Sequence, residues 1–158
     1  DARQMTYHLL DAENVQQLLV NLFMVAVLPA LGEELLFRGI LQKLFAAWTR
    51  NIHWGILIAA VLFSAMHIQF YGFIPRLFLG MVFGYLFFWS GSIWLPILGH
   101  FVNNGSAVVF YYFVGNQRSM FSGDFETVGS SAFMIIFSGL MIALCCYLVY
   151  LNEFSRIK

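Results

Sequence analysis

Long apolar runs constrain the fold of this chain more than any other feature of its sequence. Of the 158 residues, 61% are hydrophobic and only 10% are charged, whereas about a quarter of the residues are charged in ordinary soluble domains. A soluble protein of this size has too little interior to bury so much apolar surface. The sequence therefore predicts an integral membrane protein that is surrounded by the lipid bilayer.

Five apolar stretches are predicted to cross the membrane, because a helical span needs about 17–25 mostly apolar residues. The stretches are 15–48, 54–70, 76–90, 94–114 and 130–151. The first is too long for one perpendicular span, and we expect Pro29 and Gly32 to break or kink it, as either one bent helix or two helices. The predicted fold class is all-α, a polytopic transmembrane helical bundle of about five to six spans.

The organisation of the chain predicts a single domain over residues 1–158, since there are no internal repeats, low-complexity tracts or linkers. The chain opens on Asp1 without a signal-peptide pattern, so we expect it to lack N-terminal spans that precede it in a longer protein. The net charge is zero, which gives no reason to expect nucleic acid as a partner. Cys145 and Cys146 are adjacent, unlike the cysteines of a disulfide framework or a metal site.

Two further patterns bear on how the spans are arranged. If the spans alternate in direction, four basic residues lie on one side of the membrane and two on the other, namely Lys43, Arg50, Arg156 and Lys158 against Arg76 and Arg118. Cytoplasmic loops are enriched in lysine and arginine, so the side with four is predicted to be cytoplasmic. Gly80 and Gly84 are small residues four positions apart, a spacing that lets two helices approach closely.

Three charged residues lie close together in the middle of the first apolar run: Glu33, Glu34 and Arg38. A charged side chain at the centre of a bilayer costs roughly 2.5–3.5 kcal/mol on insertion scales, so their presence indicates a function. Glu34 and Arg38 are four residues apart and are predicted to form an ion pair. Glu33 points about 100° away from Glu34 on a helix and is left as the candidate catalytic carboxylate. The alternative is a structural cluster of all three charges that ties helices together.

Two later spans each contribute a histidine. His67 has no acidic neighbour in the sequence, so its partner is expected from another helix, and Glu33 is the obvious candidate. His100 and Asn104 are four residues apart and share one helix face. Such a pair of neutral donors suits the stabilisation of an oxyanion. The alternative for this pair is a polar clamp between helices, which is common in membrane proteins.

The motifs of several other membrane hydrolases are missing from the sequence. There is no His-Glu-x-x-His zinc motif and no Gly-x-Ser-x-Gly elbow. No pair of aspartates lies in the predicted spans, because Asp124 falls in a polar loop. A site without a cofactor is favoured, with zinc held by Glu33, His67 and His100 as the minority alternative.

Three short motifs on successive predicted spans carry a family resemblance. They are Glu-Glu-x-x-x-Arg at 33–38, Phe-x-x-x-His at 63–67 and His-x-x-x-Asn at 100–104, and Gly39 extends the first to Phe-Arg-Gly. Together, and in this order, they resemble the CAAX protease and bacteriocin-processing (Abi) family, which includes the Ras-converting prenyl endopeptidases. The resemblance covers residues 18–104, and the last span follows it by architecture only.

The resemblance implies a role for each matched residue. Glu33 would be the catalytic glutamate, and it would act with His67 to bind and deprotonate a water molecule. His100 and Asn104 would stabilise the oxyanion of the tetrahedral intermediate. The Glu34 carboxylate and the guanidinium four residues later would be the supporting ion pair.

The activity implied by the resemblance is that of a metal-independent, glutamate-type intramembrane endopeptidase. Its substrate would be a peptide or a prenylated protein, cleaved to remove a CAAX tripeptide or to process a bacteriocin or signal peptide. Its expected location is the bacterial cytoplasmic membrane, with the active site open toward the cytoplasm. The alternatives are a non-catalytic scaffold or immunity protein of the same fold, and a transporter whose polar residues line an ion path.

Overall fold

The longest element is one helix of 35 residues from Val15 to Thr49. The structure is a computed structural model that describes residues 12, 14–68, 70 and 72–115. Along the chain the long helix consists of α2 (Val15–Leu22), the π-helical η1 (Phe23–Val27), α3 (Leu28–Glu34), the π-helical η2 (Leu35–Leu41) and α4 (Gln42–Thr49). Asn14 caps its first turn, because its Oδ1 accepts a hydrogen bond of 2.9 Å from the backbone N–H of Gln17.

The break that we considered at Pro29 and Gly32 does not divide this helix. Both residues lie in the short α3, which has a π-helical segment directly before it and another directly after it. In a π-helical turn the backbone bond reaches one residue further than in an α-helix, and here the N–H of Leu28 donates to the carbonyl of Phe23. Of the two forms expected for this stretch, the structure therefore has the single helix.

Three further helices follow: α5 (Ile52–Met66), α6 (Phe73–Ser90) and α7 (Trp94–Gly115). They overlap the predicted spans 54–70, 76–90 and 94–114, whereas the predicted span 130–151 lies outside the described residues. Asn51 caps α5 through a bond of 2.9 Å from the N–H of His53. Gly91 ends α6 with a positive φ of 64°, a conformation that glycine adopts without steric cost.

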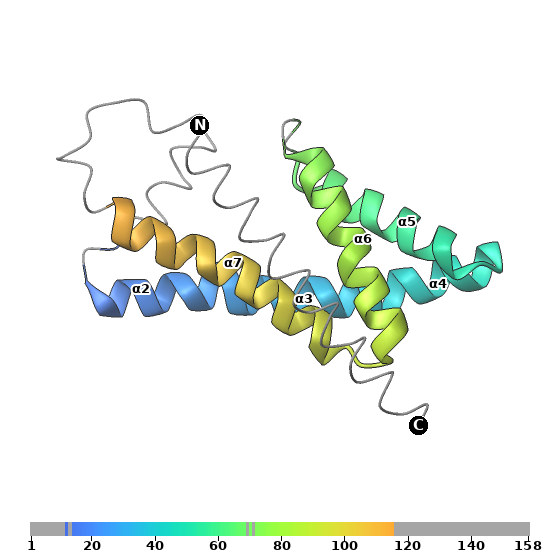
Figure 1. The fold of residues 1–158 in the computed structure, drawn as a ribbon, viewed down its shortest axis with the longest axis horizontal. Coiled ribbons are helices and arrows are strands. Elements are labelled where there is room, and N and C mark those ends of the chain that lie inside the picture. The colour runs from blue at the N-terminus through green and yellow to red at the C-terminus, as the bar shows by residue number, and fades with distance from the viewer. Residues whose placement is uncertain (1–11, 13, 69, 71, 116–158) are drawn as a thin grey trace, which may run out of the picture.

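The shorter helices cover different halves of the long helix (Figure 1). α7 runs back along the N-terminal half and contacts α2, η1 and α3. α5 packs against α4 and η2, and α6 packs against α5, η2 and α7. The two sets of helices therefore meet at the middle of the long helix, where Glu33, Glu34 and Arg38 lie.

Small residues let α5 approach both of its neighbours closely. A Cβ atom on Gly55 would lie 2.7 Å from the Cβ of Ala46 in α4. On the other side of α5, a Cβ on Gly80 would lie 3.2 Å from the Cβ of Ala60. The glycines of α6 thus serve the close helix packing that their spacing predicted.

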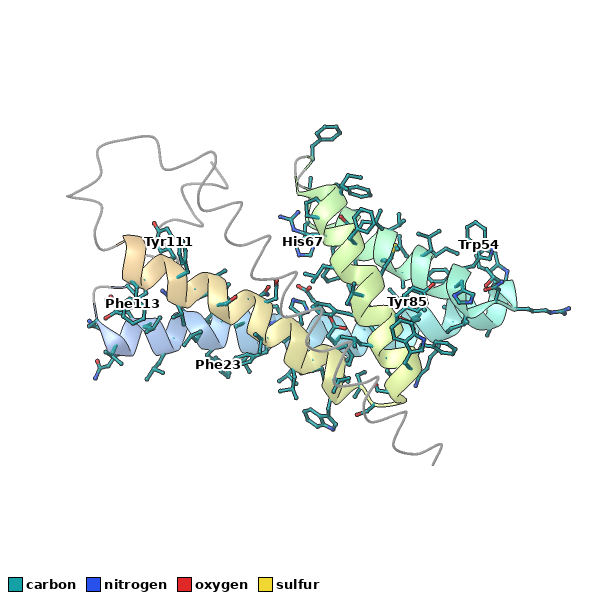
Figure 2. The ribbon with its side chains drawn as sticks, in the orientation of Figure 1. Phe23, Trp54, His67, Tyr85, Tyr111 and Phe113 are labelled. Carbon is teal, nitrogen blue, oxygen red and sulfur yellow. The ribbon has the colours of Figure 1, made fainter. Side chains whose placement is uncertain are left out.

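The outer surface of the bundle is strongly apolar. Two of the described helices, Val15–Thr49 and Phe73–Ser90, are long and apolar enough to cross a membrane, and α5 is apolar but shorter. Phe23 is 52% exposed and Trp54 is 56% exposed, and both point away from the neighbouring helices (Figure 2). Every described element is a helix, which confirms the all-α class. The number of spans stays a prediction.

Candidate functional site

Buried polar side chains gather where the helix sets meet. Glu34 and Arg38 from the long helix and His100 from α7 are at most 3% exposed. The aromatic rings of Phe63 and Phe83 enclose them, and each of these rings is 2% exposed. A polar cluster enclosed in this way depends on its own members for hydrogen bonds, and Glu34 Oε2 is left without a partner among the described residues.

Arg38 joins two helices at the base of the cluster. Its Nη1 donates to Glu34 Oε1 at 2.9 Å, and its Nη2 donates to the carbonyl oxygen of Gly80 on α6 at 2.8 Å. Its guanidinium carbon lies 4.9 Å from the ring centroid of Phe63 and 5.5 Å from that of Phe83. The ion pair expected from the i, i+4 spacing is therefore present, and it also fixes α6 against the long helix.

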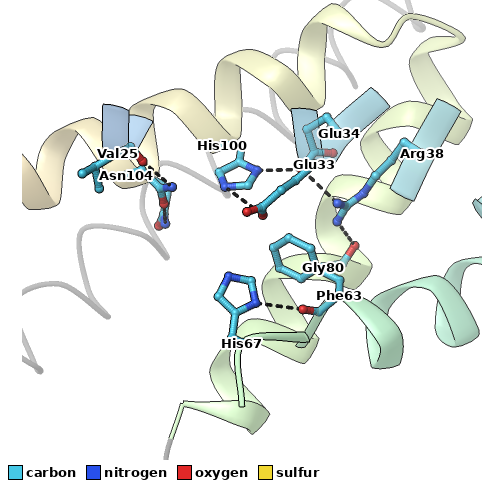
Figure 3. Close-up of polar contacts among 10 residues, drawn as sticks. Val25, Glu33, Glu34, Arg38, Phe63, His67, Gly80, His100 and Asn104 are labelled. Carbon is cyan, nitrogen blue, oxygen red and sulfur yellow. Dashed lines mark hydrogen bonds and ion pairs between the residues drawn. The ribbon is translucent and has the colours of Figure 1, made fainter. Parts of the chain in front are cut away.

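His100 lies between the two adjacent glutamates (Figure 3). Its Nδ1 is 2.8 Å from Glu34 Oε1, and its Nε2 is 3.8 Å from Glu33 Oε2. An ionised carboxylate only accepts hydrogen bonds, so the hydrogen of the shorter contact belongs to Nδ1. In a neutral imidazole Nε2 is then an acceptor. The ring is also stacked on Phe83, with 5.5 Å between the ring centroids.

Glu33 is the more accessible of the two glutamates. Its side chain is 22% exposed, whereas that of Glu34 is completely buried. Its Oε2 atom is itself buried and receives no hydrogen bond from any described residue. Both Arg38 and Arg76 interact electrostatically with its carboxylate.

His67 follows the last residue of α5, and its ring is held by its own helix. Its Nδ1 donates to the carbonyl oxygen of Phe63 at 2.9 Å. The contact that the structure gives to Glu33 comes from His100 and not from His67, the partner that we expected. Because its Nδ1 carries the hydrogen, a neutral His67 presents Nε2 as an acceptor, on the side of the ring that faces away from Phe63 (Figure 3).

Asn104 lies one turn beyond His100 on α7 but has different partners. Its Nδ2 donates to the carbonyl oxygen of Val25 at 3.1 Å, and its Oδ1 accepts from Asn103 Nδ2 at 3.2 Å. The expected pair of His100 and Asn104 therefore faces the same long helix, as the i, i+4 spacing predicts. The two side chains contact different segments of that helix, α3 and η1 (Figure 3).

Sequence reasoning missed the backbone acceptors and one side chain of this region. Gln42 is 1% exposed, and its Nε2 donates to the carbonyl oxygen of Gly84 at 3.1 Å. It repeats, one turn further on, the contact of Arg38 with Gly80. Two features of the sequence could have indicated this contact. Gln42 is a polar residue four positions after Arg38, and Gly80 and Gly84 have the same spacing on α6.

Among the described residues, no group of three or more His, Cys, Asp or Glu side chains is arranged to hold a metal ion. Zinc binding by Glu33, His67 and His100 accordingly remains an alternative from the sequence alone.

Comparison with known proteins places the described region within one family. The family described as type II CAAX prenyl endopeptidase Rce1-like matches residues 15–106, which is more than half of the chain. The uncharacterized protein YpbD of Bacillus subtilis is 28% identical over 86 residues, which is 52% of this chain and 41% of that protein. An uncharacterized 24.3 kDa protein of Escherichia coli is 33% identical over 94 residues, which is 56% of this chain and 42% of that protein. This chain spans less than half the length of these relatives. No solved structure matches it.

Proposed function

The chain belongs to the family of Rce1-like type II CAAX prenyl endopeptidases, and we propose that it is the catalytic part of an intramembrane endopeptidase. Its substrate would be a peptide or a prenylated protein that enters the site from the membrane. Integral membrane location follows from the family and the apolar helices. Opening of the site toward the cytoplasm, on the side of Lys43 and Arg50, is part of the proposal.

The observation that carries the proposal is the facing pair of Glu33 Oε2 and His100 Nε2, both of which are acceptors when the imidazole is neutral. They are 3.8 Å apart, which is too far for a direct hydrogen bond. Two acceptors in a buried site require a donor between or beside them. A water molecule is the smallest group that can donate one hydrogen to each. We infer that this position holds the nucleophilic water of a hydrolase.

Hydrolysis would begin when Glu33 removes a proton from this water. The water oxygen bonds to the carbonyl carbon of the scissile peptide, and the electron pair of the C=O double bond moves to the carbonyl oxygen. When this oxyanion collapses, the C–N bond breaks and the proton held by Glu33 passes to the leaving nitrogen. The products are a carboxylic acid, which ionises, and a free amine.

The supporting residues would fix the base and the water in place. The hydrogen bond from His100 Nδ1 to Glu34 holds the imidazole in the tautomer that turns Nε2 toward Glu33, as a buried carboxylate does in serine hydrolases. Arg38 holds Glu34 in place by a hydrogen bond of 2.9 Å to its Oε1. The reaction needs no metal, because a carboxylate and an imidazole suffice to hold and deprotonate the water.

Asn104 and His67 would complete the site. Asn104 has a second N–H besides the one that binds Val25, and this N–H can be donated to the oxyanion. His67 would present its Nε2 to the leaving side of the peptide bond and relay the proton from Glu33 to the nitrogen. This assignment differs from the one implied by the resemblance, in which His67 is the partner of Glu33 at the water.

Substitutions of the two residues that face the water test the proposal. Glu33→Gln is expected to lower kcat by about 10²–10⁴-fold, the usual contribution of a general base. His100→Gln should also lower kcat, and the double variant should be no slower than the slower single variant, since both residues act on one water. The measurement is cleavage of a prenylated peptide by the whole protein in liposomes. His53→Gln is the matched control, because His53 contacts Tyr85 outside this cluster.

Two outcomes would contradict the proposal. If the two losses multiply, Glu33 and His100 act on different groups and do not share a water. If neither substitution changes the rate of cleavage, the polar cluster is structural, and the scaffold alternative replaces the enzyme.

A further inference from the structure

Pro29 removes a hydrogen-bond donor from the long helix four residues after Val25, whose carbonyl contacts Asn104. Val25 lies in the π-helical η1, and in an α-helical turn its carbonyl would accept from the N–H of residue 29. Residue 29 is proline, which has no N–H. The carbonyl of Val25 therefore lacks the donor that an α-helical turn would give it, in the interior of a 35-residue apolar helix.

Asn104 supplies a donor to this carbonyl from a different helix. Its Nδ2 lies 3.1 Å from the carbonyl oxygen of Val25. Within the hydrocarbon region no water is present to satisfy a freed carbonyl, so proline is tolerated there where a neighbouring side chain does so. The contact thus couples a backbone position of η1 to a side chain of the proposed catalytic site.

Small residues on the long helix let α7 come near enough for this contact. Ala26 and Ala30 are 0% and 1% exposed. A Cβ atom on Gly105 would lie 3.6 Å from Leu22 Cδ2 and 3.8 Å from the Cβ of Ala26. α7 therefore crosses close to the main chain of the long helix beside Asn104, and a short amide side chain reaches a backbone carbonyl.

The two contacts of Asn104 fix the direction of its amide. Its nitrogen is held by Val25, and its oxygen is held by the side-chain nitrogen of Asn103. An amide nitrogen carries two hydrogens, so one remains for donation while the plane of the amide is set by the other contacts.

We propose that Pro29 is a positioning residue of the catalytic site, which leaves the Val25 carbonyl to Asn104 and so holds the Asn104 amide where it can donate to the substrate oxyanion. This inference rests on the proposed function. It assigns to Pro29 a part in catalysis that acts through Asn104 and involves no contact with the substrate.

The direct test is Pro29→Ala. Alanine returns an N–H to position 29, which can bind the Val25 carbonyl and release Asn104. We expect kcat to fall about tenfold, less than the 10²–10³-fold loss when an oxyanion donor is deleted, with KM unchanged. The melting temperature should not fall, since alanine is the better helix former. Pro29→Gly also returns the N–H and should lower kcat in the same way.

Pro75→Ala is the matched control. Pro75 lies in the first turn of α6, where the N–H groups have no partner within the helix. The N–H that alanine adds at this position has no helix carbonyl to bind. Therefore kcat and KM should both stay at the wild-type values.

A double-substitution cycle separates positioning from a general structural effect. In an Asn104→Ala background, Pro29→Ala should cause no further loss of kcat, because the residue through which Pro29 acts is gone. The inference is overturned if Pro29→Ala leaves kcat unchanged in the wild type, or if its loss is equally large in both backgrounds. In those cases Asn104→Ala alone still lowers kcat and the proposed function stands. If the wild-type protein cleaves no peptide, the proposed function fails, and this inference fails with it.

Discussion

At the scale of single residues, Glu33 and Glu34 are identical side chains with different surroundings. Glu34 is completely buried and accepts hydrogen bonds from Arg38 and His100. Each glutamate retains one buried oxygen, Oε2, without a described donor, but the side chain of Glu33 is 22% exposed. Because adjacent helix positions point about 100° apart, one carboxylate can orient the imidazole while its neighbour stays available to react.

The residue contacts differ in how far the sequence could predict them. The contact of Glu34 with Arg38 follows from i, i+4 spacing, which is a property of the helix itself. The contact of Glu34 with His100 does not, because it depends on where α7 crosses the long helix. The acceptor of Asn104 is a backbone carbonyl. Every residue has one, so the sequence does not show which carbonyl a side chain will contact. In the further inference above, Pro29 is the residue that leaves this acceptor to Asn104.

Arg38→Met is expected to lower the free energy of unfolding by about 3–5 kcal/mol, the usual cost of breaking a buried ion pair. It leaves the buried Glu34 without its cation and the Gly80 carbonyl without its donor. The melting temperature of the purified protein in detergent measures this loss. Lys43→Met is the control, since Lys43 is exposed on the same helix. Equal small changes in the two variants would mean that the ion pair does not stabilise the fold.

At the scale of elements, the long helix and α6 are joined by two repeated contacts. Arg38 and Gln42 donate to the carbonyls of Gly80 and Gly84, respectively. The two donors are four residues apart, and so are the two acceptors. Successive turns of the long helix therefore bind successive turns of α6. The glycine spacing predicted close packing of α6 but not these bonds, because the sequence does not say which helix α6 meets.

Gly84→Ala tests this packing. A Cβ atom at position 84 would lie 2.8 Å from Ile56 Cγ2 and 2.9 Å from Gln42 Oε1. We expect a loss of about 1–3 kcal/mol in the free energy of unfolding, as in overpacked cores. Gly32→Ala is the matched control, because no atom lies within 4 Å of its added Cβ. That variant should be as stable as the wild type or more stable by about 0.5–1 kcal/mol.

The two glycine variants are compared by thermal unfolding in the same detergent. A melting temperature for Gly84→Ala at or above that of Gly32→Ala would contradict the close packing of α6 on α5 and on the long helix.

At the scale of the whole molecule, the described region has apolar side chains outside and a charged cluster inside. The composition predicted a membrane protein, and the lengths of the apolar stretches predicted the all-α class. It could not predict that the two helix sets would meet at the middle of one continuous helix. That meeting point depends on the lengths of the connections and on the packing of glycines and alanines, which no local pattern specifies.

The most direct test of the central claim compares membranes that contain the wild-type protein with membranes that contain Glu33→Gln at matched abundance. Newly formed peptide termini are identified by mass spectrometry, and the melting temperatures of both proteins confirm that they are folded. We predict termini that arise with the wild type and are lost with Glu33→Gln, and their sequences would identify the substrate class. The same set of termini from both proteins would contradict the assignment of Glu33 as the catalytic base.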